Sequence, residues 1–403
     1  MIESLRHSYN QSFDPDRYQS MLERIEQEYP GQLDFRIAET PVFVDHRFTQ
    51  QMIDACNYIV EKIAAPDFLE RTQSSIPDQW KIGGKEGKPT FLAFDFGVCT
   101  DENGALSPQL IELQGFPSLF AYQAKLAEWY QMTGPIDEKL SPYASGLNEH
   151  SYQQLLQKLI VGSHDPREVV LLEIHPAQQK TRIDFAITRT LLDIPVVCLT
   201  EIRGENGKLF YERNGTLHPI KKIYNRIIFD ELDQQTEDVK RLGELLKGAV
   251  EVEWCPHPNW FYRVSKFLLP FLHHPNVPPT YFLDQIKQIP TDLSQYVLKP
   301  LFSFAGQGVI IDPTPEDLTK ITDPEHWILQ RKVAYAPVIP TPDDPAKLEI
   351  RLFYFWPDDA ERPFPTLNLA RLSKGKMVGT RYNKDRTWVG GSICFFESSS
   401  HLS

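Results

Sequence analysis

The stretch Tyr296-Val-Leu-Lys-Pro-Leu-Phe-Ser-Phe-Ala-Gly-Gln-Gly-Val-Ile-Ile311 carries the pattern that decides the fold. A lysine, Lys299, lies at the end of a short apolar strand, and a loop of small residues leads into a second apolar strand. Such a hairpin can fold over a nucleotide, because backbone N–H groups can face phosphate oxygens while a lysine neutralises their charge. The candidate nucleotide-binding residues are Lys299, Gly306, Gln307 and Gly308. A plain β-hairpin with glycines at its turn fits the same residues, and the GxxxxGK[ST] pattern of a Walker loop is absent.

A further apolar strand, residues 327–333, ends in polar residues. The backbone of such a strand can hydrogen-bond the edge of an adenine base, and a lysine at its end can reach phosphate. The candidates here are Gln330, Arg331, Lys332 and Val333. An edge strand with surface charges fits the segment as well.

Two predicted strands carry side chains suited to a metal ion. Glu349 and Arg351 are two positions apart, so they share one face of a strand, and a carboxylate beside an arginine suits a metal with phosphate or a simple salt bridge. Glu112 and Gln114 have the same spacing, and their oxygens are hard ligands of the kind that Mg²⁺ prefers. The predicted metal ligands are therefore Glu112, Gln114 and Glu349, although a half-exposed strand also explains the first two.

The segment 380–392 closes the set with Arg381 and the pair Gly390-Gly391. Glycines allow a backbone to approach a ligand closely, and an arginine can bind a phosphate or an acyl-phosphate. A glycine pair at the start of a strand is otherwise ordinary.

Charge and composition narrow the class of protein. The chain has 403 residues and a net charge of −12, which disfavours a sequence-independent nucleic-acid binder. The segment 362–390 nevertheless holds seven basic residues against one acidic residue, Asp385, and this fits either a polyphosphate pocket or a solvated loop.

The sequence also indicates a compartment. The five cysteines form no CxxC pair and no zinc spacing, the first residues lack an apolar signal core, and no stretch approaches the length of a membrane span. We therefore expect a cytoplasmic protein with free thiols and no membrane partner.

Apolar periodicity gives the expected order of elements. Residues 1–70 read as helical, with one apolar stripe through Met52, Cys56, Val60 and Ile63. Residues 90–114 read as two strands around a turn at 101–104, and Ser118 is the expected N-cap of a helix that runs to Tyr130. Residues 168–200 read as a βαβ unit, hairpin turns follow at 204–207 and 214–215, and the Pro- and His-rich stretch 256–280 joins two units.

The order of these motifs resembles the ATP-grasp superfamily. It is most similar to the branch of eukaryotic-type glutathione synthetases and glutathionylspermidine synthases, where the metal-binding strand comes early in the chain. In that branch an Ile-Glu-x-Asn motif followed by a serine-containing turn supplies two metal ligands, and Ile111–Gln114 followed by Ser118 stands in its place. Two departures stand out. Gln114 replaces the asparagine, and Leu92–Phe96 lacks the arginine of a Gly-Arg-Phe-Asp-Phe motif.

The resemblance implies an α/β (α+β) ATP-grasp fold, preceded by a Rossmann-like unit and a helical N-terminal region. The expected units are 1–164, with the acidic strand; 165–255, Rossmann-like; 256–345, with the hairpin and hinge; and 346–403, the core strands. The implied cofactors are ATP and Mg²⁺, and the implied reaction joins a carboxylate to an amine through an acyl-phosphate. Arg381 would stabilise the transferring phosphoryl group. Arg226 matches an arginine of that branch, and it would either contact the substrate or form a structural pair within the protein. A phosphotransferase and a non-catalytic nucleotide-binding protein are the alternatives.

Overall fold

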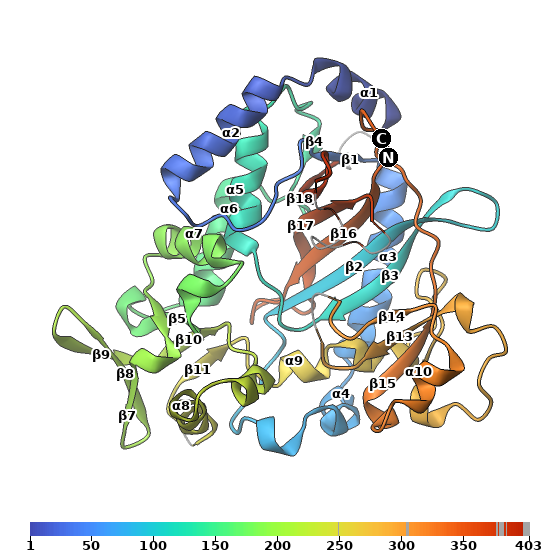
Figure 1. Cartoon of the computed structure of the whole chain (residues 1–403). Coiled ribbons are helices and arrows are strands. Elements are labelled where there is room, and N and C mark those ends of the chain that lie inside the picture. Colours follow the sequence, from blue (N-terminus) through green and yellow to red (C-terminus); the bar gives the residue numbers. More distant parts are fainter. Residues whose placement is uncertain (249, 304–305, 376–377, 379–382, 384, 398–403) are drawn as a thin grey trace.

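The computed structural model describes residues 1–248, 250–303, 306–375, 378, 383 and 385–397. Its centre is an antiparallel sheet of five strands in the order β18-β17-β16-β2-β3 (Figure 1). The bounds are β2 (Phe91–Thr100), β3 (Leu106–Gln114), β16 (Lys347–Phe355), β17 (Phe364–Ser373) and β18 (Gly390–Ser392). The predicted hairpin at 90–114 is confirmed, with Asp101 and Ala105 closing its turn through a backbone hydrogen bond.

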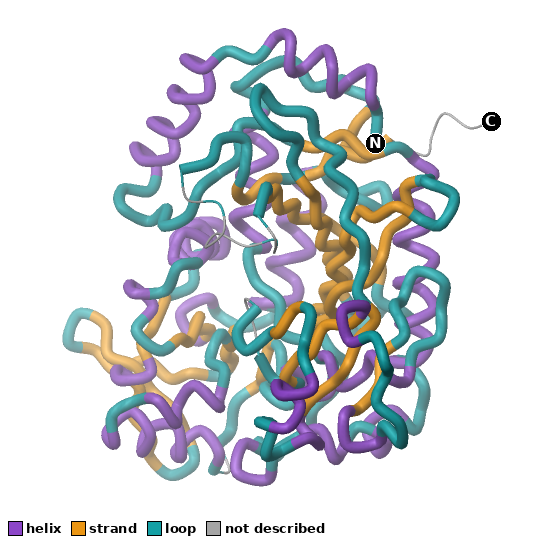
Figure 2. The backbone as a smooth tube through the Cα atoms, turned by 45° about the vertical axis from the view of Figure 1, so that its right-hand side comes forward, coloured by secondary structure: helices purple, strands orange, loops and turns teal. Residues whose placement is uncertain are grey.

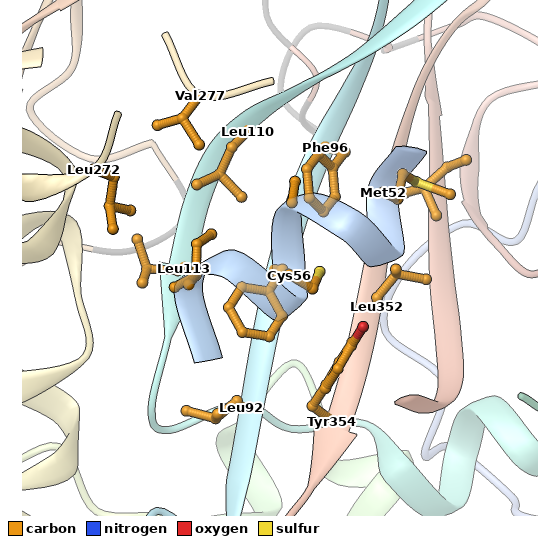
Figure 3. Packing of buried hydrophobic residues seen from close by; sticks show 14 of the residues in the cluster. Met52, Cys56, Leu92, Phe96, Leu110, Leu113, Leu272, Val277, Leu352 and Tyr354 are labelled. Atoms are coloured by element: carbon orange, nitrogen blue, oxygen red, sulfur yellow. The ribbon is translucent and has the colours of Figure 1, made fainter. Parts of the chain in front are cut away.

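One face of this sheet is apolar and packs on helix α3 (His46–Ile63). Alternate residues along each strand point to this face, because successive side chains of a strand project to opposite sides. Figure 3 shows Met52 and Cys56 of α3 facing Phe96, Leu110 and Leu352 of the sheet. The predicted stripe of α3 is confirmed, since all four of its side chains are buried.

Helix α5 (Phe120–Tyr130) belongs to a second apolar cluster, which covers part of the opposite face. The prediction that Ser118 caps this helix is wrong. The N-cap is one residue later, at Leu119, which has a left-handed backbone conformation with φ 77°. A side chain of another helix accepts hydrogen bonds from N–H groups at this end of α5. Asp184 accepts from the N–H groups of Leu119 at 3.1 Å and Tyr122 at 2.9 Å. A distant carboxylate thus replaces the local hydroxyl at the positive end of the helix.

The predicted βαβ unit is confirmed and belongs to a parallel sheet in the order β11-β10-β5-β6. Its elements are β5 (Val169–Glu173), α7 (Arg182–Leu192), β6 (Val196–Cys198), β10 (Lys222–Asn225) and β11 (Glu253–Cys255). A three-stranded sheet projects from this unit (Figure 1) and consists of β7 (Ile202–Glu205), β8 (Lys208–Arg213) and β9 (Thr216–Ile220).

The two strands predicted within residues 296–311 lie in a third sheet. This sheet is antiparallel and has the order β12-β15-β13-β14. Its strands are β12 (Thr280–Phe282), β13 (Tyr296–Pro300), β14 (Ile310–Ile311) and β15 (Trp327–Arg331). The stretch 256–280 reaches it through α9 (Trp260–Arg263) and the 3-10 segment η8 (Lys266–Phe271), both of which run past the end of β3. Gly115 allows this passage, since a Cβ there would lie 2.4 Å from the carbonyl oxygen of Trp260.

A strand near residue 43 and a strand near residue 395 lie in one small sheet. Strand β1 (Val42–Val44) pairs in parallel with β19 (Cys394–Glu397), which pairs with β4 (Leu140–Ser141). The remaining α-helices are α1 (Glu3–Ser12), α2 (Pro15–Glu28), α4 (Phe68–Arg71), α6 (Glu149–Leu156), α8 (Glu237–Lys247) and α10 (Pro315–Thr319). Figure 2 shows many of the strands in the middle of the molecule, other strands at its left edge, and most helices toward its periphery.

All five cysteines lie within the described residues and are free. Within the described part of the chain, no helix combines the length and the apolar character needed to cross a bilayer.

Candidate functional site

A row of paired charges crosses the polar face of the five-stranded sheet. Asp95 on β2 lies directly opposite Glu112 on β3 and Arg351 on β16. Glu349 lies opposite Arg371 on β17. Side chains that face each other across neighbouring strands are about 5 Å apart at Cβ, so five charged groups from four strands share one small area.

Asp95 is the centre of this row. Its side chain is only 2% exposed and accepts from Arg351 Nη2 and Arg371 Nη2, each at 2.7 Å. Burial alone would raise the pKa of Asp95, but the charges of Arg351 and Arg371 outweigh burial and hold it below its usual value. The carboxylate therefore stays ionised and fixes both guanidinium groups.

Glu349 is held from both sides. Arg371 Nη2 lies 3.2 Å from one of its oxygens, and the Tyr335 hydroxyl donates to the other. Tyr335 gets this close because it crosses β2 at Gly97, where a Cβ would lie 2.8 Å from its ring. Burial raises the pKa of Glu349, and the charge of Arg371 only partly offsets this.

Lys299 enters the same site from the other sheet. Its Nζ donates to the carbonyl of Ile111 on β3 at 3.1 Å and to Gln330 Oε1 on β15 at 2.6 Å. Gln330 also donates to Thr280 Oγ1 at 3.2 Å and is buried. Burial lowers the pKa of Lys299 to about 8, although Glu112 acts in the opposite direction. The predicted phosphate lysine thus lies beside the predicted metal-binding strand.

A second buried lysine, Lys266 of η8, bridges the two sheets. Its Nζ lies 3.0 Å from Glu112 Oε1 and also donates to the carbonyl of Ser303 in the hairpin loop. Glu112, Gln114, Lys266 and Ser303 line a small pocket with a volume of about 60 Å³. Ligand pockets usually measure about 300–1,000 Å³. The pocket in this structure is therefore smaller than a nucleotide site.

The predicted metal ligands lie on two strands, with Glu112 and Gln114 on β3 and Glu349 on β16. Within the described ranges, no three His, Cys, Asp or Glu side chains converge closely enough to hold a metal ion. Asp95 and Glu112 face each other, however, and Gln114 follows on the same face of β3, opposite Ala93. Two carboxylates and an amide oxygen are ligands that Mg²⁺ accepts. Both oxygens of Asp95 and both oxygens of Glu349 already have partners in the chain, so either carboxylate would have to exchange a partner for the ion.

The other predicted nucleotide residues lie at the hairpin and at the end of β15. Gly306 and Gly308 both have φ of 72°, which suits glycine, and they are exposed together with Gln307. Arg331 lies over the ring of Tyr296, 5.5 Å from its centroid. Lys332 pairs with Asp312 at the surface, and Val333 is half-buried.

The predicted pair Gly390-Gly391 contacts protein instead of facing the small pocket. A Cβ on Gly390 would lie 2.4 Å from the carbonyl oxygen of Arg36, and the N–H of Gly391 donates to that oxygen at 2.9 Å. This close approach accounts for Gly390 without a nucleotide. Arg381, the predicted phosphoryl-stabilising residue, lies outside the described residues.

Arg226 connects the parallel sheet to the turn after β3. Its Nη1 donates to the carbonyl of Pro117 at 2.7 Å, and its guanidinium carbon lies 4.6 Å from the ring centroid of Phe116. Nε of this buried side chain has no hydrogen-bond partner among the described residues. Arg226 therefore fixes the turn after β3.

A larger cavity opens at the other end of the charged row. Its volume is about 310 Å³, and its lining comes from β17, β18, the start of α5, the residues before α7, the segment 34–36, Val378 and Asn383. Arg371 lies in its lining together with Gly390 and Gly391. The cavity and the small pocket therefore flank the same row of charges.

Sequence reasoning assigned no role to three residues of this site: Asp95, Arg371 and Lys266. Asp95 gave a readable signal, because it is the one charge in the apolar run 91–99 and a charge in a buried strand requires a partner. In the sequence, Arg371 is one of seven basic residues in 362–390 and has no feature that distinguishes it from the others. Lys266 gave no local signal, since its role depends on contacts with residues 154 and 37 positions away.

Comparisons with known proteins bear on the fold. No family model matches this chain, and no curated protein matches its sequence. One similar solved structure is a glutathione synthetase-like effector from Globodera pallida in its apo form. The two chains are 10% identical, the alignment covers 95% of this chain and 97% of the other, and the TM-score is 0.56. The predicted fold is confirmed: this chain has a mixed α/β, ATP-grasp-like architecture that resembles a distantly related glutathione synthetase-like structure.

Proposed function

We propose that this protein is an ATP- and Mg²⁺-dependent ligase that joins a carboxylate to an amine. One observation carries the proposal. Lys299 Nζ of the hairpin donates to the carbonyl of Ile111 at 3.1 Å, directly beside Glu112. The phosphate-binding motif and the acidic strand, 188 positions apart in the chain, thus share one site.

The residues of the site suit phosphoryl transfer, which depends mostly on positioning and charge neutralisation. Lys299 and Lys266 would hold phosphate oxygens, and Arg371 would neutralise charge at the transferring group. Glu112, Gln114 and Glu349 would hold Mg²⁺, with Glu349 exchanging a partner in the chain for the ion. Bound Mg-ATP supplies the phosphoryl group that converts the substrate carboxylate into an acyl-phosphate, from which the amine displaces inorganic phosphate.

A second candidate, a non-catalytic nucleotide-binding protein, is favoured by two observations. The pocket beside Glu112 has a volume of only about 60 Å³. In addition, Asp95, Glu112 and Glu349 each have a lysine or arginine partner. Such a protein would bind ATP but would turn over no substrate.

Calorimetric titration with ATP, with and without Mg²⁺, tests the nucleotide site. Lys299→Ala should weaken binding by about 1.5–3 kcal/mol, on the order of tenfold or more, because a charge-assisted contact is lost. Lys221→Ala is the control, since Lys221 is an exposed lysine paired with Glu168 on the parallel sheet. Absence of ATP binding by the wild type would refute the proposal.

Product analysis separates the reaction classes. Incubation with ATP, an acid and an amine should release inorganic phosphate and yield an amide. A phosphorylated substrate without amide would instead identify a phosphotransferase. ATP binding without turnover of any substrate would identify the non-catalytic alternative.

A further inference from the structure

Gln330 occupies a buried position at the middle of the sheet β12-β15-β13-β14. It lies on β15, directly opposite Thr280 of β12 on one side and Val297 of β13 on the other. Lys299 follows two positions after Val297, so it is the diagonal neighbour of Gln330 on the same face of the sheet. Long side chains reach across such a diagonal. Sheet register therefore brings Thr280, Gln330 and Lys299 together from three strands.

The hydrogen bonds of these three side chains can run in one direction only. The ammonium of Lys299 has donors and no acceptor, so Gln330 must present Oε1 to it, and the two atoms lie 2.6 Å apart. Nε2 of Gln330 then donates to Thr280 Oγ1 at 3.2 Å. The hydroxyl of Thr280 in turn donates to the carbonyl of Pro278 at 2.9 Å. The amide is thus held at both ends, and its acceptor is fixed in front of the lysine.

The fixed acceptor sets the direction of the Lys299 ammonium. An ammonium has three N–H groups. Two of them donate within the chain, to Gln330 Oε1 and, at 3.1 Å, to the carbonyl of Ile111 on β3. Because the N–H groups of an ammonium are arranged tetrahedrally, two fixed bonds also fix the direction of the third group. A donor that is oriented before the ligand arrives loses less entropy on binding than a mobile one.

The same contacts argue against a direct role of Gln330 in reading a base. The sequence placed this residue among the candidate adenine contacts at the end of β15. In the structure, its side-chain oxygen and nitrogen both have partners within the protein, and the residue is only 3% exposed. Its chemistry is therefore directed at Lys299 and not at a ligand.

We propose that Gln330, anchored by Thr280, is a positioning residue that orients the Lys299 ammonium toward a phosphate group of the nucleotide. It makes no contact with the adenine base. This inference rests on the proposed function, in which Lys299 holds phosphate oxygens. Two residues are thereby added to the phosphate-binding apparatus, although neither touches the nucleotide.

Gln330→Met tests this role, because methionine is of similar length and lacks the amide acceptor. Calorimetric titrations would use two probes: Mg-ATP, and tripolyphosphate, which has phosphates but no base. We expect the affinity for both probes to fall by the same factor, about tenfold, because the charged donor loses its orientation. A loss for Mg-ATP alone would make Gln330 a base contact, and wild-type affinity for both probes would leave it without a role. Either result would overturn the inference.

The matched control is Gln285→Met. Gln285 is an exposed residue at the end of the 3-10 segment η9 (Leu283–Gln285), between β12 and β13. The same exchange there should leave the affinity for both probes unchanged. If the control lost as much affinity as Gln330→Met, the loss would not come from the contact with Lys299, and the inference would be overturned.

A double-mutant cycle separates positioning from a general loss of structure. If Gln330 acts through Lys299, Gln330→Met should cause no further loss of Mg-ATP affinity in a Lys299→Ala background, since the oriented group is already absent. A merely structural effect would persist in that background. A further loss of about tenfold in the double variant would therefore overturn the positioning role.

Thr280→Val tests the anchor, and it replaces the first test if Gln330→Met does not fold. The variant keeps the branched shape but lacks the hydroxyl that accepts from Gln330. We expect a smaller loss for both probes, about threefold, because the amide keeps its oxygen but loses one neutral hydrogen bond. This loss should also vanish in the Lys299→Ala background. Wild-type affinity in Thr280→Val would overturn the anchored arrangement.

The outcomes distinguish this inference from the proposed function. Loss of Mg-ATP affinity in Lys299→Ala but not in Gln330→Met would overturn the positioning role and leave the nucleotide site in place. The expected loss in Gln330→Met without formation of any amide product would support the positioning role and overturn the ligase reaction. Absence of ATP binding by the wild type would overturn both.

Discussion

Arg371 on β17 reaches across the intervening strand β16 and donates from Nη2 to Asp95 Oδ2 on β2 at 2.7 Å. β16 contributes Arg351 to the same carboxylate. Three strands are thus tied through one buried acid, which lies opposite Glu112. Asp95 holds both guanidinium groups in place. This contact therefore fixes their positions between the small pocket and the larger cavity.

Asp95→Asn should destabilise the protein strongly. The substitution leaves the buried Arg351 and the partly buried Arg371 without their shared anion, and removal of one partner of a buried ion pair costs about 3–5 kcal/mol. Urea denaturation would measure the change in the free energy of unfolding. The matched control is Asp165→Asn, which breaks the solvent-exposed pair with Arg167 and should leave stability nearly unchanged. Equal effects of the two substitutions would contradict the structural role of Asp95.

ATP affinity should fall by about tenfold between pH 7 and pH 9, because one unit of pH above a pKa costs a factor of ten. Burial lowers the pKa of Lys299 to about 8, so its ammonium loses the proton in this range and its attraction for phosphate disappears. Calorimetry at several pH values would measure the slope. Lys299→Ala should bind weakly and without this slope, whereas an identical slope in the variant would assign the titration to another group.

Gly390→Ala and Gly391→Ala should differ sharply. A Cβ on Gly390 would lie 2.4 Å from the Arg36 carbonyl oxygen, at a φ of 125° that other residues rarely adopt, whereas a Cβ on Gly391 has no neighbour closer than 3.7 Å. The first substitution should cost about 1–3 kcal/mol and lower Tm, and the second should cost little. If both variants keep the wild-type Tm and lose ATP affinity, the glycines serve the nucleotide and not the contact with Arg36.

Stability should decrease as the pH rises from about 4.5 to about 8 because of Glu173. Burial raises its pKa from 4.5 to about 8, so in this range the folded chain keeps a proton that the unfolded chain has released. The stabilisation is complete below the unfolded pKa and is lost through the folded pKa. Glu173→Gln should reduce the slope of Tm against pH and raise stability at pH 8 and above by about 1–3 kcal/mol.

The control for Glu173 is Glu149→Gln, in the exposed first turn of α6. A surface substitution of this kind usually changes stability by less than about 0.5 kcal/mol. An unchanged slope of Tm against pH in Glu173→Gln would show that Glu173 is not the titrating group.

Local sequence patterns determined the secondary elements and much of the fold class. Periodicity and turn residues act over a few positions, and three elements follow from them. These are the helix stripe of Met52, Cys56, Val60 and Ile63, the hairpin at 90–114 and the βαβ unit at 168–200. The alternation of Glu112 with Gln114, and of Glu349 with Arg351, likewise placed each pair on one strand face. The resemblance carried by the order of the motifs led to the ATP-grasp-like architecture.

Tertiary structure alone decided which partners these residues have. Strand order placed Asp95 between Glu112 and Arg351, and the crossing of η8 brought Lys266 to Glu112. Asp184 displaced Ser118 at the start of α5 because two helices meet there. Pairing across strands depends on sheet order and register, and neither is encoded in the spacing of neighbouring residues. The sequence therefore determined which chemical groups each strand presents, and long-range packing of the strands decided which of these groups meet.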